Sequence, residues 1–150
     1  MNAMSRNLSI ALACAGALPF WLFMLAPEPV AGLNTATLFV EYGAVIASFM
    51  AGTLWGQMQG SRSDLFIVAA SNVLALISFA AIAFTTTAIG MLVQMVLFWL
   101  LLAADYRIYA GDIQRRWYWR LRLWVTVAVT LAYDIMLLDC ALGPCGWRGS

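Results

Sequence analysis

Three polar side chains that could carry chemistry lie inside long apolar stretches of the sequence: Glu41, Gln94 and Asp134. Polar and ionisable groups at membrane depth are costly and commonly mark proton relays or ligand sites. No basic residue shares these stretches, so a carboxyl there would favour its protonated form or share a proton with the other. The three residues are therefore a candidate proton or polar site. The structural alternative has Glu41 stabilised by a helix N-terminus and Asp134 bonded to Thr130 or to interfacial water.

Residue types on which most enzymes depend are scarce in this chain. It contains no His, which removes the common haem ligand, the usual general base and the commonest metal ligand. Zinc-protease, Ser-His-Asp, P-loop and dinucleotide-binding motifs are missing as well. We therefore expect a non-enzymatic protein with no catalytic residues, no metal site and no cofactor bound through its own ligands. A structural phospholipid is compatible with this composition.

Two of the three cysteines are close together near the C-terminus. Cys140 and Cys145 flank a Gly-Pro pair, and an oxidising compartment would permit a disulfide between them. A reduced pair is the alternative. Cys14 lies in an apolar stretch, where we expect it to pack as a small hydrophobic residue.

Five apolar stretches must position these side chains, and each is close to the roughly 20 residues that a helix needs to cross a bilayer. They cover residues 8–26, 37–57, 65–84, 88–104 and 123–142. The chain is 64% hydrophobic and only 10% charged, which leaves too few polar groups to coat a soluble globule. Lipid cannot satisfy the backbone of an open strand. The sequence therefore predicts one all-α domain over residues 1–150, an integral membrane bundle of five transmembrane helices.

The arginines fall almost entirely on one side of this topology, and Lys is absent. With a cytoplasmic N-terminus, seven of the eight Arg residues lie inside and only Arg148 lies outside. Such a bias follows the positive-inside rule and predicts that the N-terminus is inside and the C-terminus outside. The net charge of +1 gives no reason to expect nucleic acid as a partner.

A stripe of small residues marks one side of the second stretch. Its members recur every four residues: Ala44, Ser48, Gly52 and Gly56. A second such stripe, of Gly43, Ala47 and Ala51, runs beside it. Small residues at this spacing let helix backbones approach closely in lipid. We predict that the first stripe is a helix-packing face, used either within the bundle or against a partner subunit.

A basic and aromatic collar precedes the fifth stretch. It comprises Arg115, Arg116, Trp117, Trp119, Arg120 and Arg122. Such a mixture suits a membrane surface with anionic head groups, where each Arg contributes about 1 kcal/mol. The collar is expected to set the topology and contact lipid. Binding of a specific phospholipid such as cardiolipin, or of a partner subunit, is the alternative.

Three motifs spread over nearly the whole chain carry a family resemblance. Residues 16–21 resemble the Gly-x-x-Pro-Phe element of the family that includes transmembrane protein 69. Tyr42 and residues 48–56 resemble its second-helix element, with Ala51 in place of a Gly and Leu54 where members often have His or Arg. The residues that resemble its last block are Asp105, Trp117, Tyr118, Leu121, Arg122 and Thr126. The resemblance implies a small five-helix protein of the bacterial cytoplasmic or mitochondrial inner membrane, with a domain of unknown function.

Two functions fit these observations. The first is a non-catalytic accessory or structural subunit, or an assembly factor, of a larger energy-transducing complex, respiratory or photosynthetic. Its partners would be membrane lipids and other integral membrane subunits, and a homo-oligomer would also fit. The second is a small proton-linked transporter that uses the outer-half carboxylates, Glu41 and Asp134. Five helices are few for a transporter, so this function would require an oligomer.

Overall fold

The computed structural model describes residues 3–25, 34–58, 65–109 and 116–142. Within these ranges the chain forms five α-helices and no strand. They are α1 (Ala3–Leu25), α2 (Thr35–Met58), α3 (Leu65–Phe84), α4 (Thr87–Tyr109) and α5 (Arg116–Leu142). The predicted all-helical class is confirmed.

Helix α3 matches its predicted stretch, whereas α4 and α5 extend further at the end where they approach each other. The fourth stretch was expected to end at residue 104, but α4 continues through Asp105 to Tyr109. The fifth was expected to begin at residue 123, but α5 begins at Arg116. Hydropathy falls where charged and aromatic residues begin, while backbone hydrogen bonding continues past them.

Local sequence accounts for two of the helix starts. Asn34 caps α2, because its Oδ1 accepts hydrogen bonds from the backbone N–H groups of Ala36, at 2.9 Å, and Thr37, at 3.2 Å. Between α3 and α4 the chain turns within two residues, Thr85 and Thr86. The backbone N–H of Gly90 then donates to the carbonyl of Thr86 at 2.8 Å. The short turn makes α3 and α4 antiparallel neighbours.

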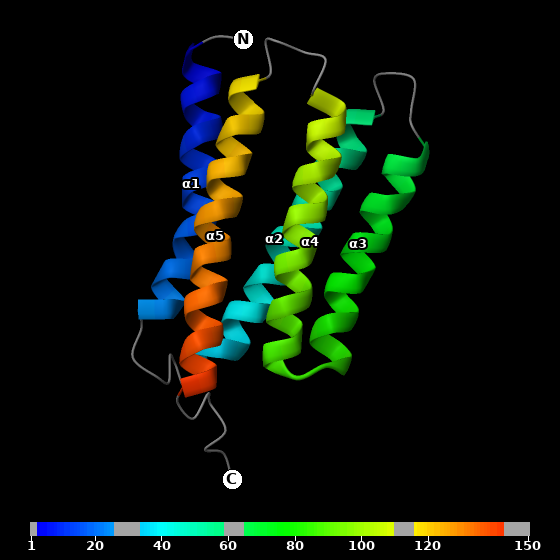
Figure 1. The fold of residues 1–150 in the computed structure, drawn as a ribbon. Helices are drawn as coiled ribbons and strands as arrows, with labels where there is room; N and C mark the ends of the chain where they lie inside the picture. Colours follow the sequence, from blue (N-terminus) through cyan, green and yellow to red (C-terminus); the bar gives the residue numbers. More distant parts are fainter. Residues whose placement is uncertain (1–2, 26–33, 59–64, 110–115, 143–150) are drawn as a thin grey trace.

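The helices form an up-and-down bundle, in which each helix runs opposite to the one before it (Figure 1). Helix α2 packs on α1, α3 and α4, while α5 packs on α1 and α4. Helices α1, α2, α4 and α5 therefore form a four-helix ring, and α3 packs outside it against α2 and α4. The start of α1 and the end of α5 lie at opposite ends of the bundle (Figure 1).

An aromatic cluster fills the centre of the ring. Phe20 of α1 is fully buried, and its ring centroid lies 5.2 Å from that of Phe39, 6.2 Å from Phe98 and 5.7 Å from Tyr133. Edge-on geometry dominates these contacts, as the quadrupole of aromatic rings favours. The cluster joins α1, α2, α4 and α5 at one level.

By length and composition, four of the described helices could each cross a membrane, and α3 contributes a shorter apolar segment, Ala69–Phe84. Large apolar side chains are exposed on the outside of the bundle, among them Leu22, Phe49, Phe79 and Leu138. Such a surface is suited to lipid contact. The chain is a multi-pass membrane protein.

Candidate functional site

Gln94 is fully buried among α2, α4 and α5. Its Oε1 accepts a hydrogen bond from the hydroxyl of Tyr133 at 2.6 Å, and its Nε2 donates to the backbone carbonyl of Val40 at 2.8 Å. A buried amide without partners would be costly in an apolar interior. Here both ends of the amide are paired, and the pairs tie α4 to α5 and to α2.

Gly43 makes room for this polar contact. A Cβ atom at this position would overlap the Tyr133 hydroxyl and Oε1 of Gln94. The absence of a side chain at Gly43 therefore allows the amide and the phenol to meet against the backbone of α2. Gly43 belongs to the second small-residue stripe.

A second tyrosine connects α2 to α1. The hydroxyl of Tyr42 donates to the backbone carbonyl of Gly16 at 2.9 Å. The Tyr42 ring lies edge-on to Phe20, with centroids 5.0 Å apart, and to Phe23, with centroids 6.0 Å apart. This contact anchors α1 in the turn that precedes Pro19.

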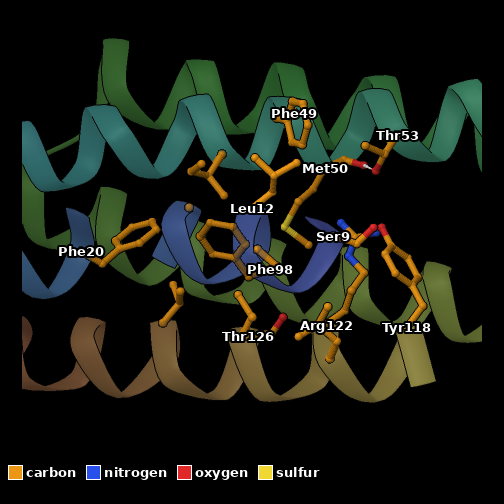
Figure 2. Close-up of a pocket in the computed structure, with 16 residues that line it drawn as sticks. Ser9, Leu12, Phe20, Phe49, Met50, Thr53, Phe98, Tyr118, Arg122 and Thr126 are labelled. Carbon is orange, nitrogen blue, oxygen red and sulfur yellow. Dashed lines mark hydrogen bonds between the residues drawn. The ribbon is translucent and has the colours of Figure 1, made fainter. Parts of the chain in front are cut away.

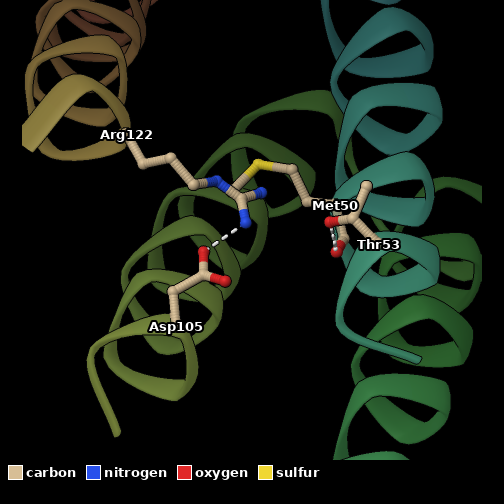
Figure 3. Close-up of polar contacts among 4 residues, drawn as sticks. All are labelled: Met50, Thr53, Asp105 and Arg122. Carbon is tan, nitrogen blue, oxygen red and sulfur yellow. Dashed lines mark hydrogen bonds and ion pairs between the residues drawn. The ribbon is translucent and has the colours of Figure 1, made fainter. Parts of the chain in front are cut away.

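An ion pair lies at the end of the bundle where α4 ends and α5 begins. Asp105 of α4 pairs with Nη1 of Arg122 in α5, and the two side chains are 0% and 10% exposed (Figure 3). The guanidinium carbon of Arg122 is 5.7 Å from the centre of the Tyr118 ring. Each charge of the pair compensates the other, which is what burial of two charges requires.

A pocket of about 350 Å³ lies between α1, α2 and α5 (Figure 2). Ser9, Thr53, Tyr118 and Arg122 stand at one end of it, and Phe20 lies toward the other. Between these ends the lining is mostly apolar. The pocket is therefore amphipathic, with a polar end at the Asp105–Arg122 pair.

Of the candidate proton or polar site Glu41, Gln94 and Asp134, the structure places only Gln94 inside the bundle. Gln94 is buried and bonded to Tyr133 and Val40, whereas Glu41 and Asp134 are exposed. Adjacent residues on a helix point about 100° apart, so burial of Tyr133 turns Asp134 outward. Glu41 instead borders a separate pocket of about 50 Å³, which the Thr-rich turn between α3 and α4 also lines.

The predicted packing stripe that begins at Ala44 does not lie as a whole against the other helices of the bundle. Ala44 is buried, but Ser48 and Gly52 are exposed, and a Cβ at Gly52 would meet nothing within 4 Å. Steps of four residues drift by about 40° each on a helix of 3.6 residues per turn, so the stripe rotates out of the interface. The side chains of residues 55–58, and hence position 56, lie outside the described part.

The buried line of α2 follows steps of three and four residues, which average close to 3.6. Its members are Ala36, Val40, Gly43, Ala47, Ala51 and Leu54. This line includes the whole second stripe. Docking of the exposed stripe on a partner subunit stays a prediction.

The arginines of the collar do not form one surface. Arg122 faces inward to Asp105, whereas Arg120 is exposed. Asp105 occupies one side of the Arg122 guanidinium, and contact of the collar with head groups or a partner subunit stays a prediction. Arg115 and the side chain of Arg116 lie outside the described residues.

The aromatic residues of the collar pack in pairs with tyrosines. The Trp117 and Tyr118 rings are 5.8 Å apart, and the Trp119 ring is 5.3 Å from that of Tyr106 in α4. The second pair joins the start of α5 to the end of α4 beside the ion pair. Both tryptophans are half-buried, so they keep some surface for lipid.

Two of the three cysteines, Cys14 and Cys140, lie in the described part of the chain. Cys14 is free and exposed, which corrects the expectation that it packs inside the bundle. Cys140 is half-buried near the end of α5. Cys145 lies outside the described residues, and the disulfide stays a prediction.

Asp105 and Tyr133 make contacts between helices that were not predicted from the sequence. Asp105 and Arg122 have opposite charges near the facing ends of consecutive stretches, and this signal predicts a pair across an antiparallel hairpin. Tyr133 had a weaker signal, namely a phenol at mid-helix that needs a partner in lipid.

Comparison with protein families gives one match, and it covers most of the chain. A family model described as "Protein of unknown function (DUF3429)" matches residues 5–138. This region includes all the contacts described above. Comparison with curated proteins and with solved structures returned no match.

Proposed function

Since the chain belongs to the family described as "Protein of unknown function (DUF3429)", we propose a function from its geometry and composition. The protein is a non-catalytic accessory or structural subunit, or an assembly factor, of a larger energy-transducing membrane complex. Within the family, the motifs at residues 16–21 and 48–56 support kinship with transmembrane protein 69.

The observation that carries this proposal is the exposed small-residue face of α2. Ser48 and Gly52 lie on the outside of the bundle, and the space beside Gly52 is open. A Gly inside a helix lowers stability by about 1 kcal/mol relative to Ala, and contact with lipid does not compensate for this loss. Close packing of another transmembrane helix does compensate for it, because small residues let the two backbones approach each other.

Polar groups inside the bundle support the same proposal. Gln94 pairs with Tyr133 and with the carbonyl of Val40, and Asp105 pairs with Arg122. These contacts join helices to one another and stabilise a fixed arrangement. A bundle whose interior polar groups are paired in this way is suited to a structural role.

A proton-linked transporter has less support. It requires Glu41, Gln94 and Asp134 at a shared site, whereas Glu41 and Asp134 are exposed and Gln94 has other partners. Among the described side chains, the larger pocket is lined by neither carboxylate. We therefore favour the accessory subunit.

We place the protein in a bacterial cytoplasmic or mitochondrial inner membrane, with the N-terminus inside. The support is the distribution of Arg over the sequence. Arg107, Arg120 and Arg122 stand at the end of the bundle where α4 ends and α5 begins, which would be the cytoplasmic or matrix side.

Native co-purification tests the proposal. A tagged copy at its natural expression level is extracted in a gentle detergent and separated on a native gel, and its partners are identified by mass spectrometry. Migration with a large, defined set of membrane subunits is expected. Migration as a free monomer, under conditions that keep known complexes of the same membrane intact, would contradict the proposal.

A further inference from the structure

We propose that the pocket between α1, α2 and α5 binds one acyl chain of an anionic phospholipid from the adjoining leaflet, with the head group beside Arg122. This inference goes beyond the proposed function, because it concerns a ligand of the bundle itself. It holds or fails independently of any partner subunit.

The length of the pocket matches one leaflet. Its lining runs from Ser9 to Phe20 on α1 and from Tyr118 to Val129 on α5. At 1.5 Å of rise per residue, each of these spans is about 16 Å long. Half of a hydrocarbon core about 30 Å thick is about 15 Å. A chain that enters at the polar end therefore ends near the middle of the bilayer, at the aromatic cluster.

The pocket exists because α1 presents small residues to it. Ala13 and Gly16 line it on this helix, and a Cβ at Gly16 would reach only Cδ1 of Ile46, at 4.0 Å. Phe49 and Met50 of α2 line the opposite side (Figure 2). The volume of about 350 Å³ lies within the range of about 300–1,000 Å³ of ligand pockets.

Arg122 supplies hydrogen-bond donors at the polar end. Its guanidinium carries five N–H donors, and Asp105 is its only ion-pair partner among the described residues. Arg122 is 10% exposed and lines the pocket, and Met50 extends toward it from α2 (Figure 3). The remaining donors are available to phosphate or ester oxygens, which a planar guanidinium binds well.

Charge at this end of the bundle selects an anionic head group. Arg107 and Arg120 are exposed there, and Arg122 lines the pocket. Asp105 is the one acidic side chain described at this end, and it is fully buried. The described side chains at this end therefore carry an excess of positive charge, which attracts the phosphate of an anionic lipid over a zwitterionic head group.

Photo-crosslinking tests the site on the whole chain. The protein is reconstituted into phosphatidylcholine vesicles that contain a phosphatidylglycerol with a diazirine in one acyl chain. Peptide mass spectrometry then locates the labelled residues. Enrichment at pocket positions such as Met50 and Val125 is expected. Labelling spread evenly over outward-facing residues such as Leu22 and Phe79 would overturn the proposal.

A matched pair of variants on α1 adds a second measurement. Ala13→Phe fills the pocket, while Ala15→Phe adds the same side chain at an exposed position of the same helix. Labelling of the pocket should fall about tenfold in the first variant, equal to about 1.4 kcal/mol of lost binding, and stay unchanged in the second. Equal labelling in both variants would contradict an acyl chain in this pocket.

Two further experiments test which head group is bound and control for misfolding of the variant. A phosphatidylcholine with the same diazirine chain should label the pocket several-fold less than the phosphatidylglycerol probe, and equal labelling would overturn the anionic assignment. If circular dichroism shows that Ala13→Phe does not fold, Val125→Phe fills the pocket from α5. Whether or not the variants fold, the labelled positions in the unaltered protein show whether an acyl chain occupies the pocket.

Discussion

Arg122, in the second turn of α5, forms an ion pair with Asp105, a carboxylate near the end of α4 that has no exposed surface. The pair closes the α4–α5 hairpin at the end where the two helices are joined. The rings of Tyr106 and Trp119 pack in a tilted arrangement, with centroids 5.3 Å apart and an angle of 56° between their planes. One charge pair and one aromatic pair thus fix how these helices meet.

Removal of one partner of this pair should destabilise the protein more than removal of both. Arg122→Met leaves a buried carboxylate without compensation, which typically costs about 3–5 kcal/mol. The double variant Asp105→Leu/Arg122→Met removes both charges and should recover most of that loss. Unfolding free energies in detergent micelles for the single and double variants measure the coupling. Additive effects of the two substitutions would mean that the pair contributes nothing.

Tyr133→Phe should weaken the bundle by about 0.6–1.7 kcal/mol. It removes the donor to Oε1 of Gln94 while the ring keeps its place against Phe39, and hydrogen bonds between transmembrane helices average about 0.6 kcal/mol, with a maximum near 1.7. Tyr106→Phe is the control, because that side chain is 54% exposed. Equal stability of the two variants, measured by unfolding in a denaturing detergent, would contradict a role for the bond.

Two glycines of α2 should respond in opposite ways to the same substitution. Gly43→Ala places a methyl group against the Tyr133 hydroxyl and Gln94 Oε1, and overpacking of this kind costs about 1–3 kcal/mol. Gly52→Ala meets open space and should be neutral or stabilise by up to about 1 kcal/mol through helix propensity. Thermal unfolding of both variants beside the unaltered protein gives the comparison. A stable Gly43→Ala variant would mean that the polar contact tolerates displacement.

The length and hydropathy of the five stretches predicted the helices well, because crossing a bilayer sets both. They did not predict which side of each helix faces inward. In lipid the outer surface of a helix is as apolar as its inner one, so hydrophobic periodicity carries little information. Polar residues carry more information, and Gln94 is buried and hydrogen-bonded inside the bundle. Its partner Tyr133 was not predicted, because the ionisable residue of that region is Asp134, which lies next to Tyr133 and is exposed.

The Ala44-to-Gly56 stripe shows a second limit of the sequence. Repeats of four look like one face, yet they drift across a helix of 3.6 residues per turn. Ala44 is buried and Gly52 is exposed. Only the neighbouring helices decide where the interface ends, and a single sequence does not contain that information.

Reporter fusions should place the two ends of the chain on opposite sides of the membrane. Seven of the eight Arg residues lie on one side of the predicted topology, and this bias orients polytopic proteins. Green fluorescent protein inserted after Gly111 should fluoresce, since that position is predicted to be inside. Alkaline phosphatase fused at the C-terminus should be active, since it requires an oxidising exterior. The reverse pattern at either position would overturn the orientation.

Gly52→Leu should detach the protein from its complex without unfolding it. The position faces outward, and a Cβ there meets nothing within 4 Å, so the bundle itself has room for a larger side chain. A partner helix packed on Ser48 and Gly52 would instead be pushed away, because contact between small residues depends on a close approach of backbones. Phe49→Leu, at a neighbouring position that is 70% exposed, is the control and should keep the complex. Native gels measure the assembly and circular dichroism the fold. Retention of the complex by Gly52→Leu would show that this face contacts lipid, and the main support for an accessory subunit would be lost.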